Sequence, residues 1–281
     1  MHTVCHITAF DRPELQPYAT MRRHVEHREQ GIFVAEGEKV VRRLLESSLT
    51  VLSILVPEKW YRDLEPLVRA RPENIQVFLA EKKLLETLTG FSMYQGLLAV
   101  GKVPRQPSLE AALQQAPQPR LFAAVDSLSS AENMGAVVRN CAALHVSLLI
   151  IGETASSPYL RRAVRSSMGT IFQQAVFETT HLVTTLSDLK QRGMRCVAAH
   201  PHVSGRTLPQ ADLRGDCCVV LGSEGYGISK PVLDACDDAV AVPMPPTVDS
   251  LNVASAAAVF LYETNRQRGK YGCVDYGGNG R

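Results

Sequence analysis

No apolar stretch of this 281-residue chain approaches the length needed to cross a membrane. Residues 1–16 contain no continuous apolar segment of the kind found in a signal peptide, so we expect a cytoplasmic protein without a membrane partner. The seven cysteines form no CxxC pair and most stand among apolar neighbours, which predicts buried free thiols. His2, Cys5 and His6 form an isolated cluster on a terminus that we expect to be mobile, and we expect no metal site there.

Motifs of several enzyme classes are also missing. The chain has no GK[ST] triplet, which excludes a P-loop, and no GxSxG motif accompanies His200 and His202. The glycines of residues 222–227 are spaced G-x-x-G-x-G and follow a late strand, so they are not the dinucleotide-binding fingerprint. A nicotinamide-dependent dehydrogenase is therefore a distant alternative.

The formal net charge of +2 neither requires nor excludes a nucleic-acid partner, because local basic patches matter more than the total. A basic helix is expected over residues 18–30. Basic side chains gather near the start of the chain, at Arg22, Arg23, Arg28, Lys39, Arg42 and Arg43. A solvated helix face and a contact with RNA phosphates both explain them.

The order of apolar patterns predicts two domains. In residues 1–103, helical and strand patterns alternate, which predicts a small α/β domain. Residues 104–120 are rich in proline and glutamine and are predicted to be a linker with one short helix. In residues 121–268, strands alternate with helices, which predicts a parallel sheet whose ligands lie at the carboxyl ends of the strands. The glycine-rich residues 269–281 are expected to be a loose tail.

Two polar clusters in the second domain follow predicted strands. The first opens a helix expected over residues 133–144, where Asn133 is either a helix cap or a functional amide. Arg139, among small and apolar residues of that helix, needs either a structural ion pair or a phosphate or carboxylate ligand. The second cluster is the glycine loop, where Glu224 favours ligand binding over a plain turn.

The third cluster lies in residues 242–260, around which we expect the rest of the chain to be organised. A strand is predicted over residues 239–242, followed by a stiff proline segment and an alanine-rich helix. Between them, Ser250 or Asn252 is either an ordinary helix N-cap or a functional side chain held beside free backbone N–H groups.

Taken together, the clusters resemble the three motifs of the SpoU (TrmH-type) RNA 2′-O-ribose methyltransferases. The matching segments are NMGAVVRN at 133–140, LGSEGYG at 221–227, and PMP with SLNVAS within 243–255. FVAEGEK at 33–39 and YQG at 94–96 resemble the opening and the end of the family's ribosomal-protein-L30-like domain, and residues 157–169 also resemble a family segment. Ser130-Ala131-Glu132 stands where the family often has Asp-Pro, and Asn140 where it often has threonine.

The resemblance implies an α/β protein with a small L30-like N-terminal domain and a C-terminal parallel-sheet domain that forms a deep trefoil knot. It also implies a homodimer through the knotted domain, S-adenosylmethionine as cofactor, and an RNA substrate, with rRNA favoured over tRNA. The positions that match the family's cofactor contacts are Ala199, His200, Pro201, Leu221, Gly222, Ser223, Gly225, Val242, Met244, Ser250, Leu251, Asn252 and Val253.

The implied reaction is in-line methyl transfer to a ribose 2′-oxygen, for which the protein must position the hydroxyl. Arginine stays protonated at ordinary pH, so we expect Arg139 to grip an RNA phosphate and stabilise the developing alkoxide rather than act as a base. The residues expected to orient the ribose and the arginine are Asn133, Glu224, Ser250 and Asn252. The alternatives are a tRNA 2′-O-methyltransferase, a methyltransferase acting on an RNA base, and a non-catalytic RNA-binding protein on the same fold.

Overall fold

The computed structural model describes residues 2–89, 96–201 and 206–270, apart from the side chains of His24 and Thr89. Some residues named in the sequence analysis lie outside the described ones: Tyr94, Gln95, His202 and residues 271–281. The chain divides into two compact units. The N-terminal unit comprises Met1–Gln106, Ser130–Arg139 and Ser156–Gln174, and the C-terminal unit comprises Pro107–Ser129, Asn140–Ala155 and Ala175–Arg281. The domain boundaries given above stay a prediction.

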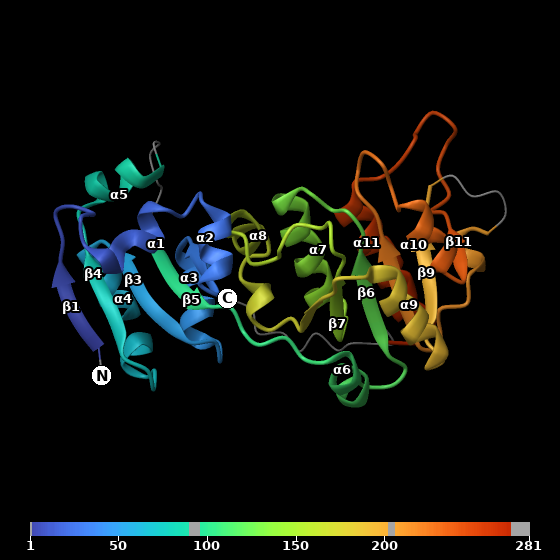
Figure 1. Ribbon diagram of the computed structural model, residues 1–281, viewed down its shortest axis with the longest axis horizontal. Coiled ribbons are helices and arrows are strands. Elements are labelled where there is room, and N and C mark those ends of the chain that lie inside the picture. The colour runs from blue at the N-terminus through green and yellow to red at the C-terminus, as the bar shows by residue number, and fades with distance from the viewer. Residues whose placement is uncertain (1, 90–95, 202–205, 271–281) are drawn as a thin grey trace, which may run out of the picture. The chain divides into compact units, whose positions relative to one another are not determined.

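The N-terminal unit is built on a five-stranded mixed sheet with the order β1-β4-β3-β5-β2 (Figure 1). The first three of these strands run parallel, whereas β5 runs antiparallel to both of its neighbours. The strands are β1 (His2–His6), β2 (Ile32–Glu36), β3 (Val51–Val56), β4 (Ile75–Leu79) and β5 (Leu98–Lys102). This mixed α/β architecture confirms the class predicted for the first part of the chain.

The helices of this unit differ from the expectation in one place. The helix expected over residues 18–30 is divided into two, because the backbone of Arg23 leaves helical geometry at ψ 77°. The Thr20 hydroxyl donates to the carbonyl of Gln16 at 2.9 Å, which satisfies an acceptor at the end of the first helix. The helices are α1 (Gln16–Ala19), α2 (His24–Glu29), α3 (Glu38–Glu46), α4 (Glu58–Arg69), α5 (Lys82–Thr89) and α8 (Arg161–Ser166).

The expectation of a mobile N-terminal segment is wrong for residues 2–6. This segment forms the edge strand β1, which pairs in parallel with β4 from His2 to His6. The His2 ring nitrogen and the Tyr61 hydroxyl lie 3.0 Å apart, and Arg12 donates to the Cys5 sulfur at 2.9 Å. Within the described residues, no group of three His, Cys, Asp or Glu side chains is placed to hold a metal ion.

The C-terminal unit contains a six-stranded sheet with the order β11-β9-β10-β6-β7-β8, and every pairing in it is parallel. This confirms the predicted parallel sheet. Strand β10 reads as a continuous apolar run and is buried throughout, as expected for a central parallel strand. The strands are β6 (Leu121–Val125), β7 (Leu148–Ile151), β8 (Val176–Glu178), β9 (Arg195–Ala199), β10 (Cys217–Leu221) and β11 (Asp238–Val240).

The helices that accompany this sheet include the predicted linker helix, which Ser108 caps by accepting from the Ala111 N–H at 3.1 Å. Helix α7 contributes residues to both units, since the division between them falls after Arg139. The helices are α6 (Leu109–Gln115), α7 (Ala131–Ala143), α9 (Leu182–Gln191), α10 (Lys230–Ala235) and α11 (Val253–Gln267).

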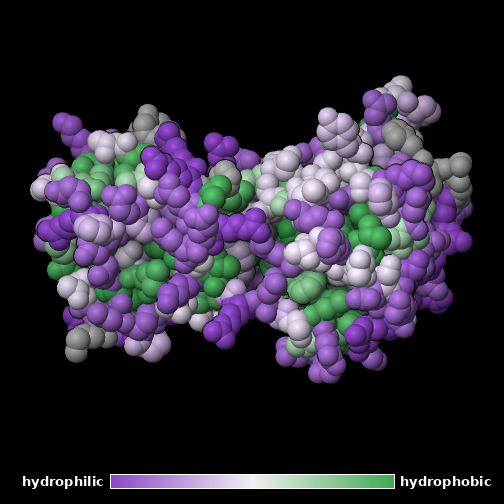
Figure 2. Space-filling model, viewed as in Figure 1, coloured by the Kyte–Doolittle hydropathy of each residue, from purple (hydrophilic) through white to green (hydrophobic). Residues whose placement is uncertain are grey.

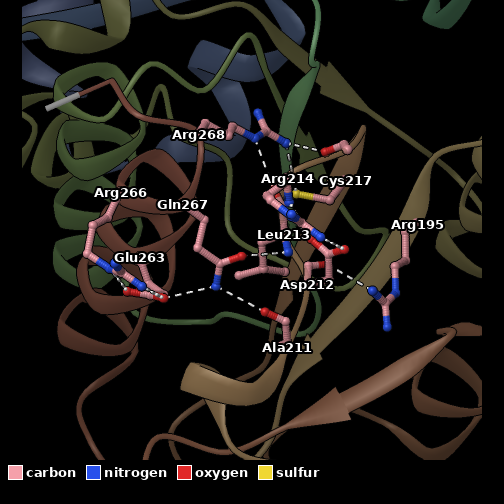
Figure 3. A network of polar contacts seen from close by, with 11 residues as sticks. Arg195, Ala211, Asp212, Leu213, Arg214, Cys217, Glu263, Arg266, Gln267 and Arg268 are labelled. Atoms are coloured by element: carbon pink, nitrogen blue, oxygen red, sulfur yellow. Dashed lines mark hydrogen bonds and ion pairs between the residues drawn. The ribbon is translucent and has the colours of Figure 1, made fainter. Parts of the chain in front are cut away.

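A network of polar contacts fixes the carboxyl end of α11 (Figure 3). Gln267 accepts from the Leu213 N–H at 2.9 Å and donates to the Ala211 carbonyl at 3.0 Å. The Arg268 guanidinium donates to the carbonyls of Leu213 and Arg120, each at 3.0 Å. These contacts tie the last helix to the segments that precede β10 and β6. The trefoil knot, which concerns how the chain threads through its own loops, stays a prediction.

The surface is mainly polar in the view of Figure 2, where hydrophilic residues cover most of the visible face of the N-terminal unit and apolar residues form small patches between them. No helix in the described part of the chain is long and apolar enough to span a membrane.

The thiols give a first testable prediction. Cys141, Cys196, Cys217 and Cys218 are buried and free, which confirms the expectation for these four residues. Burial raises the pKa of Cys141 and Cys196 to about 12 and that of Cys217 to about 11. Because only the thiolate is reactive, a disulfide reagent at about pH 8 should leave these thiols unmodified until the protein unfolds. The half-buried Cys5 should react before these four thiols, and equal native-state rates at the five sites would contradict this prediction.

Candidate active site

A pocket of about 380 Å³ lies in the C-terminal unit, where β9, β10 and β11 end. This is the edge of a parallel sheet at which ligands bind, and the volume falls in the range of roughly 300–1,000 Å³ seen for small-molecule sites. Every residue predicted to contact the cofactor lines it, with the exception of Asn252. Those residues are Ala199, His200, Pro201, Leu221, Gly222, Ser223, Gly225, Val242, Met244, Ser250, Leu251 and Val253.

The pocket also contains residues that the sequence analysis missed. Val240 and Phe260 are almost fully buried and give the pocket part of its apolar lining. The lining positions on α11 follow helical spacing, at Val253, Ala256 and Phe260. Once Val253 was predicted to line the pocket, this spacing could have identified Ala256 and Phe260. The other additions are Tyr226, Gly227 and Asp249.

The glycine loop closes on itself beside β10. The Ser223 N–H donates to the Gly227 carbonyl at 3.0 Å, and the Gly227 N–H donates back to the Ser223 carbonyl at 2.9 Å. Gly227 has a φ of 68°, which suits glycine. Among the described residues, the N–H groups of Gly222 and Gly225 have no hydrogen-bond partner, so both donors are available to a ligand.

The start of α11 is joined to this loop. Asn252 is the N-cap of the helix, since its side-chain oxygen accepts from the Ala254 N–H at 2.9 Å. Its side-chain N–H group also donates to the Glu224 carboxylate at 3.3 Å. The capping interpretation of Asn252 is therefore confirmed, and its functional role stays a prediction. This hydrogen bond connects the second and third polar clusters, and Ser250 lines the same pocket.

The other two predicted catalytic residues, Asn133 and Arg139, belong to the part of α7 that lies in the N-terminal unit. The structure does not make Asn133 the helix cap. Helix α7 begins at Ala131, and the Ser130 hydroxyl accepts from the Asn133 N–H at 3.3 Å. Arg139 is exposed and makes no hydrogen bond or ion pair with described residues of its own unit. A structural ion pair within that unit is therefore excluded for Arg139.

Asn140 follows Arg139 in α7 and is the first of its residues to belong to the C-terminal unit. Its side-chain N–H group donates to the Ala254 carbonyl at 2.6 Å. Ala254 lies in the first turn of α11, directly after the residues that line the pocket. The asparagine that departs from the family's usual threonine thus anchors this part of α7 to the start of α11.

Comparison with known proteins identifies the family. The model of the SpoU rRNA methylase family matches residues 120–262. An uncharacterised tRNA/rRNA methyltransferase of Mycobacterium tuberculosis (strain H37Rv) is 32% identical over 241 residues, which cover 84% of this chain and 82% of that protein. This chain belongs to the SpoU rRNA methylase family. It is therefore an RNA methyltransferase of the SpoU type, as its three motifs predicted.

Solved structures share the fold of this SpoU methylase. The SpoU methyltransferase AviRb from Streptomyces viridochromogenes, in complex with the cofactor AdoMet, has a TM-score of 0.79 at 24% identity and matches 92% of this chain and 98% of its own. An AdoMet-bound rRNA methyltransferase from Sinorhizobium meliloti has a TM-score of 0.78 at 20% identity and matches 94% of this chain and 98% of its own. At these identities, the similarity establishes the fold.

Asp126 is a further residue of this region, which the sequence analysis did not single out. It directly follows β6, is 5% exposed, and accepts from the Ser229 N–H at 2.7 Å. Its own N–H donates to the Leu221 carbonyl at 2.8 Å. Leu221 and Ser229 stand on either side of the glycine loop, so Asp126 holds both ends of the second SpoU motif.

Replacing Asp126 by alanine should leave the Ser229 N–H without its partner. We expect the free energy of unfolding to fall by about 1–3 kcal/mol, measured by urea titration. Asp234→Ala is the matched control, because Asp234 is an exposed acid on α10 whose ion pair with Lys230 spans one helical turn. That substitution should change stability by less than about 1 kcal/mol, and equal effects of the two changes would contradict the role given to Asp126.

Proposed function

We propose that this SpoU methylase transfers a methyl group from S-adenosylmethionine to a ribose 2′-hydroxyl in structured RNA, with rRNA preferred over tRNA. One observation carries the proposal: the loop of the second motif and the helix start of the third motif line a single pocket and are joined by the Glu224–Asn252 hydrogen bond. The curated relatives are named tRNA/rRNA methyltransferases, and the Sinorhizobium enzyme of the same fold is named an AdoMet-bound rRNA methyltransferase.

The lining of the pocket suits S-adenosylmethionine. Val242, Met244 and Leu251 line the pocket without being buried and supply an apolar surface for a flat base, and the free N–H groups of Gly222 and Gly225 supply donors for polar atoms. When bound, this cofactor supplies a methyl group on a sulfonium, which is already activated for transfer. The protein therefore has to hold the acceptor hydroxyl in line and stabilise the oxygen as its proton leaves.

The roles of the catalytic residues follow from their chemistry. Arg139 is permanently charged and grips the RNA phosphate while stabilising the developing alkoxide. Glu224 and Asn252, already paired with each other, orient the acceptor ribose together with Ser250. Asn133 orients the arginine from the first turn of the same helix.

Incubation with methyl-labelled S-adenosylmethionine and total RNA, followed by nuclease digestion and mass spectrometry, tests the reaction. We expect the added mass on ribose. Added mass on a base would instead establish base methylation, and RNA binding without S-adenosylmethionine binding in calorimetry would establish a non-catalytic RNA-binding protein. Mapping of 2′-O-methyl sites in cells with and without this gene decides between rRNA and tRNA as the substrate.

A homodimer through the C-terminal unit is also part of the proposal. Helix α11 carries an exposed stripe at Ser255, Val259, Tyr262 and Arg266, in which Val259 is 38% and Tyr262 52% exposed. Two exposed apolar side chains on the outer face of this helix suit contact with a second copy of the chain.

Tyr262→Asp should lower the mass measured by light scattering from that of a dimer to that of a monomer. Val183→Asp is the control, because Val183 on α9 is also exposed and apolar, and it should leave the mass unchanged. A monomeric wild-type protein would contradict the dimer.

A further inference from the structure

A buried carboxylate lies between two arginines in the N-terminal unit. Glu36 ends β2, and its side chain is only 6% exposed. Arg161 donates to one of its carboxylate oxygens, and Arg165, one turn further along α8, donates to the other at 2.7 Å. A carboxylate that is removed from water requires such partners, because its desolvation is otherwise too costly.

The two arginines are exposed to very different degrees. The Arg161 side chain is 15% exposed, so little of it is available to a ligand. The Arg165 side chain is 58% exposed, and its only hydrogen bonding within the described part of the chain is with Glu36. A guanidinium has five N–H donors in a rigid plane, so Arg165 offers the remainder to solvent from a fixed position.

The surface around Arg165 is positive. Residues 156–174 carry three arginines and no acidic residue. The third of these arginines, Arg162, faces Glu132 at 3.3 Å, but both side chains are mostly exposed, so this ion pair is weak. Arg43 on α3 is exposed and donates to the Met168 carbonyl at 2.6 Å, which leaves its charge uncompensated. The negative charges paired with the cluster are the buried one of Glu36, with Arg161 and Arg165, and the exposed one of Glu132, with Arg162.

We propose that Glu36 is a positioning residue that fixes Arg165 as a contact for an RNA backbone phosphate. The inference rests on the proposed function in that RNA is the ligand. A planar guanidinium matches the oxygens of a phosphate, and a ligand gains affinity when the side chain it meets is already ordered. The alternative is that Glu36 only locks α8 against β2, with no part in binding.

The first test measures the salt dependence of binding to a synthetic stem-loop RNA. Loss of one phosphate contact should lower the slope of log K against log salt by about 1 and weaken binding on the order of 10-fold at moderate salt. We expect this for Arg165→Ala. Arg62→Ala is the matched control, because Arg62 is 75% exposed and pairs with Glu58 on α4. A wild-type affinity and slope for Arg165→Ala would overturn the proposal.

The second test separates positioning from a purely structural role. Glu36→Gln should weaken RNA binding in the wild-type background and have no further effect when Arg165 is already alanine. A structural role would instead weaken binding equally in both backgrounds, which would overturn the positioning of Arg165 by Glu36.

If thermal unfolding shows that Glu36→Gln is not folded, Arg165→Lys is used in its place. That variant keeps the charge and the slope but should lose affinity because it lacks the planar fork, and wild-type affinity would refute the proposal.

Neither test requires methyl transfer, because binding is measured without S-adenosylmethionine. An Arg165-dependent slope in a protein that does not methylate RNA would refute the proposed function and leave this inference standing. If the protein methylates RNA but the salt dependence of its RNA binding does not change in Arg165→Ala, the proposed function stands and this inference is refuted.

Discussion

Arg139→Ala should abolish RNA methylation, with a loss of at least about 10²–10³-fold in kcat, while the affinity for S-adenosylmethionine changes less than about two-fold. Arg139 is exposed and has no hydrogen-bond or ion-pair partner in the described part of its own unit, so its guanidinium is available to bind a ligand. The next residue, Asn140, donates a side-chain hydrogen bond to the Ala254 carbonyl in the first turn of α11. The backbone that carries the arginine is therefore fixed at that point without the arginine's help.

Methyl incorporation into RNA and calorimetric titration with S-adenosylmethionine measure the two quantities separately. Arg139→Lys is the informative companion variant, because it keeps the charge but loses the planar fork, and we expect it to retain partial activity. If Arg139→Ala weakens cofactor binding as much as it lowers methylation, the role given to this residue is wrong.

Gly222→Ala should have the second large effect, on the glycine loop itself. A Cβ at Gly222 would lie 2.2 Å from the carbonyl carbon of Gly227 and 2.3 Å from the nitrogen of Ile228. Both atoms are backbone, so the loop would have to open to make room. We expect stability to fall by about 1–3 kcal/mol and cofactor affinity by about 10-fold or more, as measured by thermal unfolding and calorimetry.

The same loop offers a matched control. Gly225 also lines the pocket, but a Cβ there meets no atom within 4 Å. Gly225→Ala should therefore leave stability within about 0.5 kcal/mol of wild type. Equal losses for the two variants would show that the loop depends on glycine flexibility in general rather than on the close approach at Gly222.

The elements best predicted from the sequence are those with strong local signals. A parallel sheet of buried apolar strands such as β10 was expected, and so was one short helix in the linker, which the structure shows as α6. The three-residue strand β8 was missed because Val176–Glu178 is too short to show a period, and it forms only through its pairing with β7. The sequence left Asn133 open as a helix cap or a functional amide, and the structure caps α7 with Ser130 instead; residues of both kinds can cap a helix, so residue type alone did not decide it.

In the candidate site, too, residues with local sequence signals were predicted and residues that depend on distant partners were not. The polar loops of the second and third motifs were identified because glycine spacing, proline and small residues are local features of the chain. Asp126 was not identified as a member of the site, since its partner Ser229 lies 103 residues away in sequence. Glu36 and its arginines are separated by similarly large distances along the chain, and nothing local in the sequence links them.

The sequence by itself determined the family, the alternation of strands and helices, and the segments that form the pocket, because these depend on residue types at short spacing. Only the tertiary structure decided that Asp126 holds both ends of the glycine loop, that Asn252 joins its helix start to Glu224, and that Glu36 is shared by two arginines. The physical reason is that a buried polar group must find a partner wherever the folded chain brings one near, and that partner has no fixed distance in sequence.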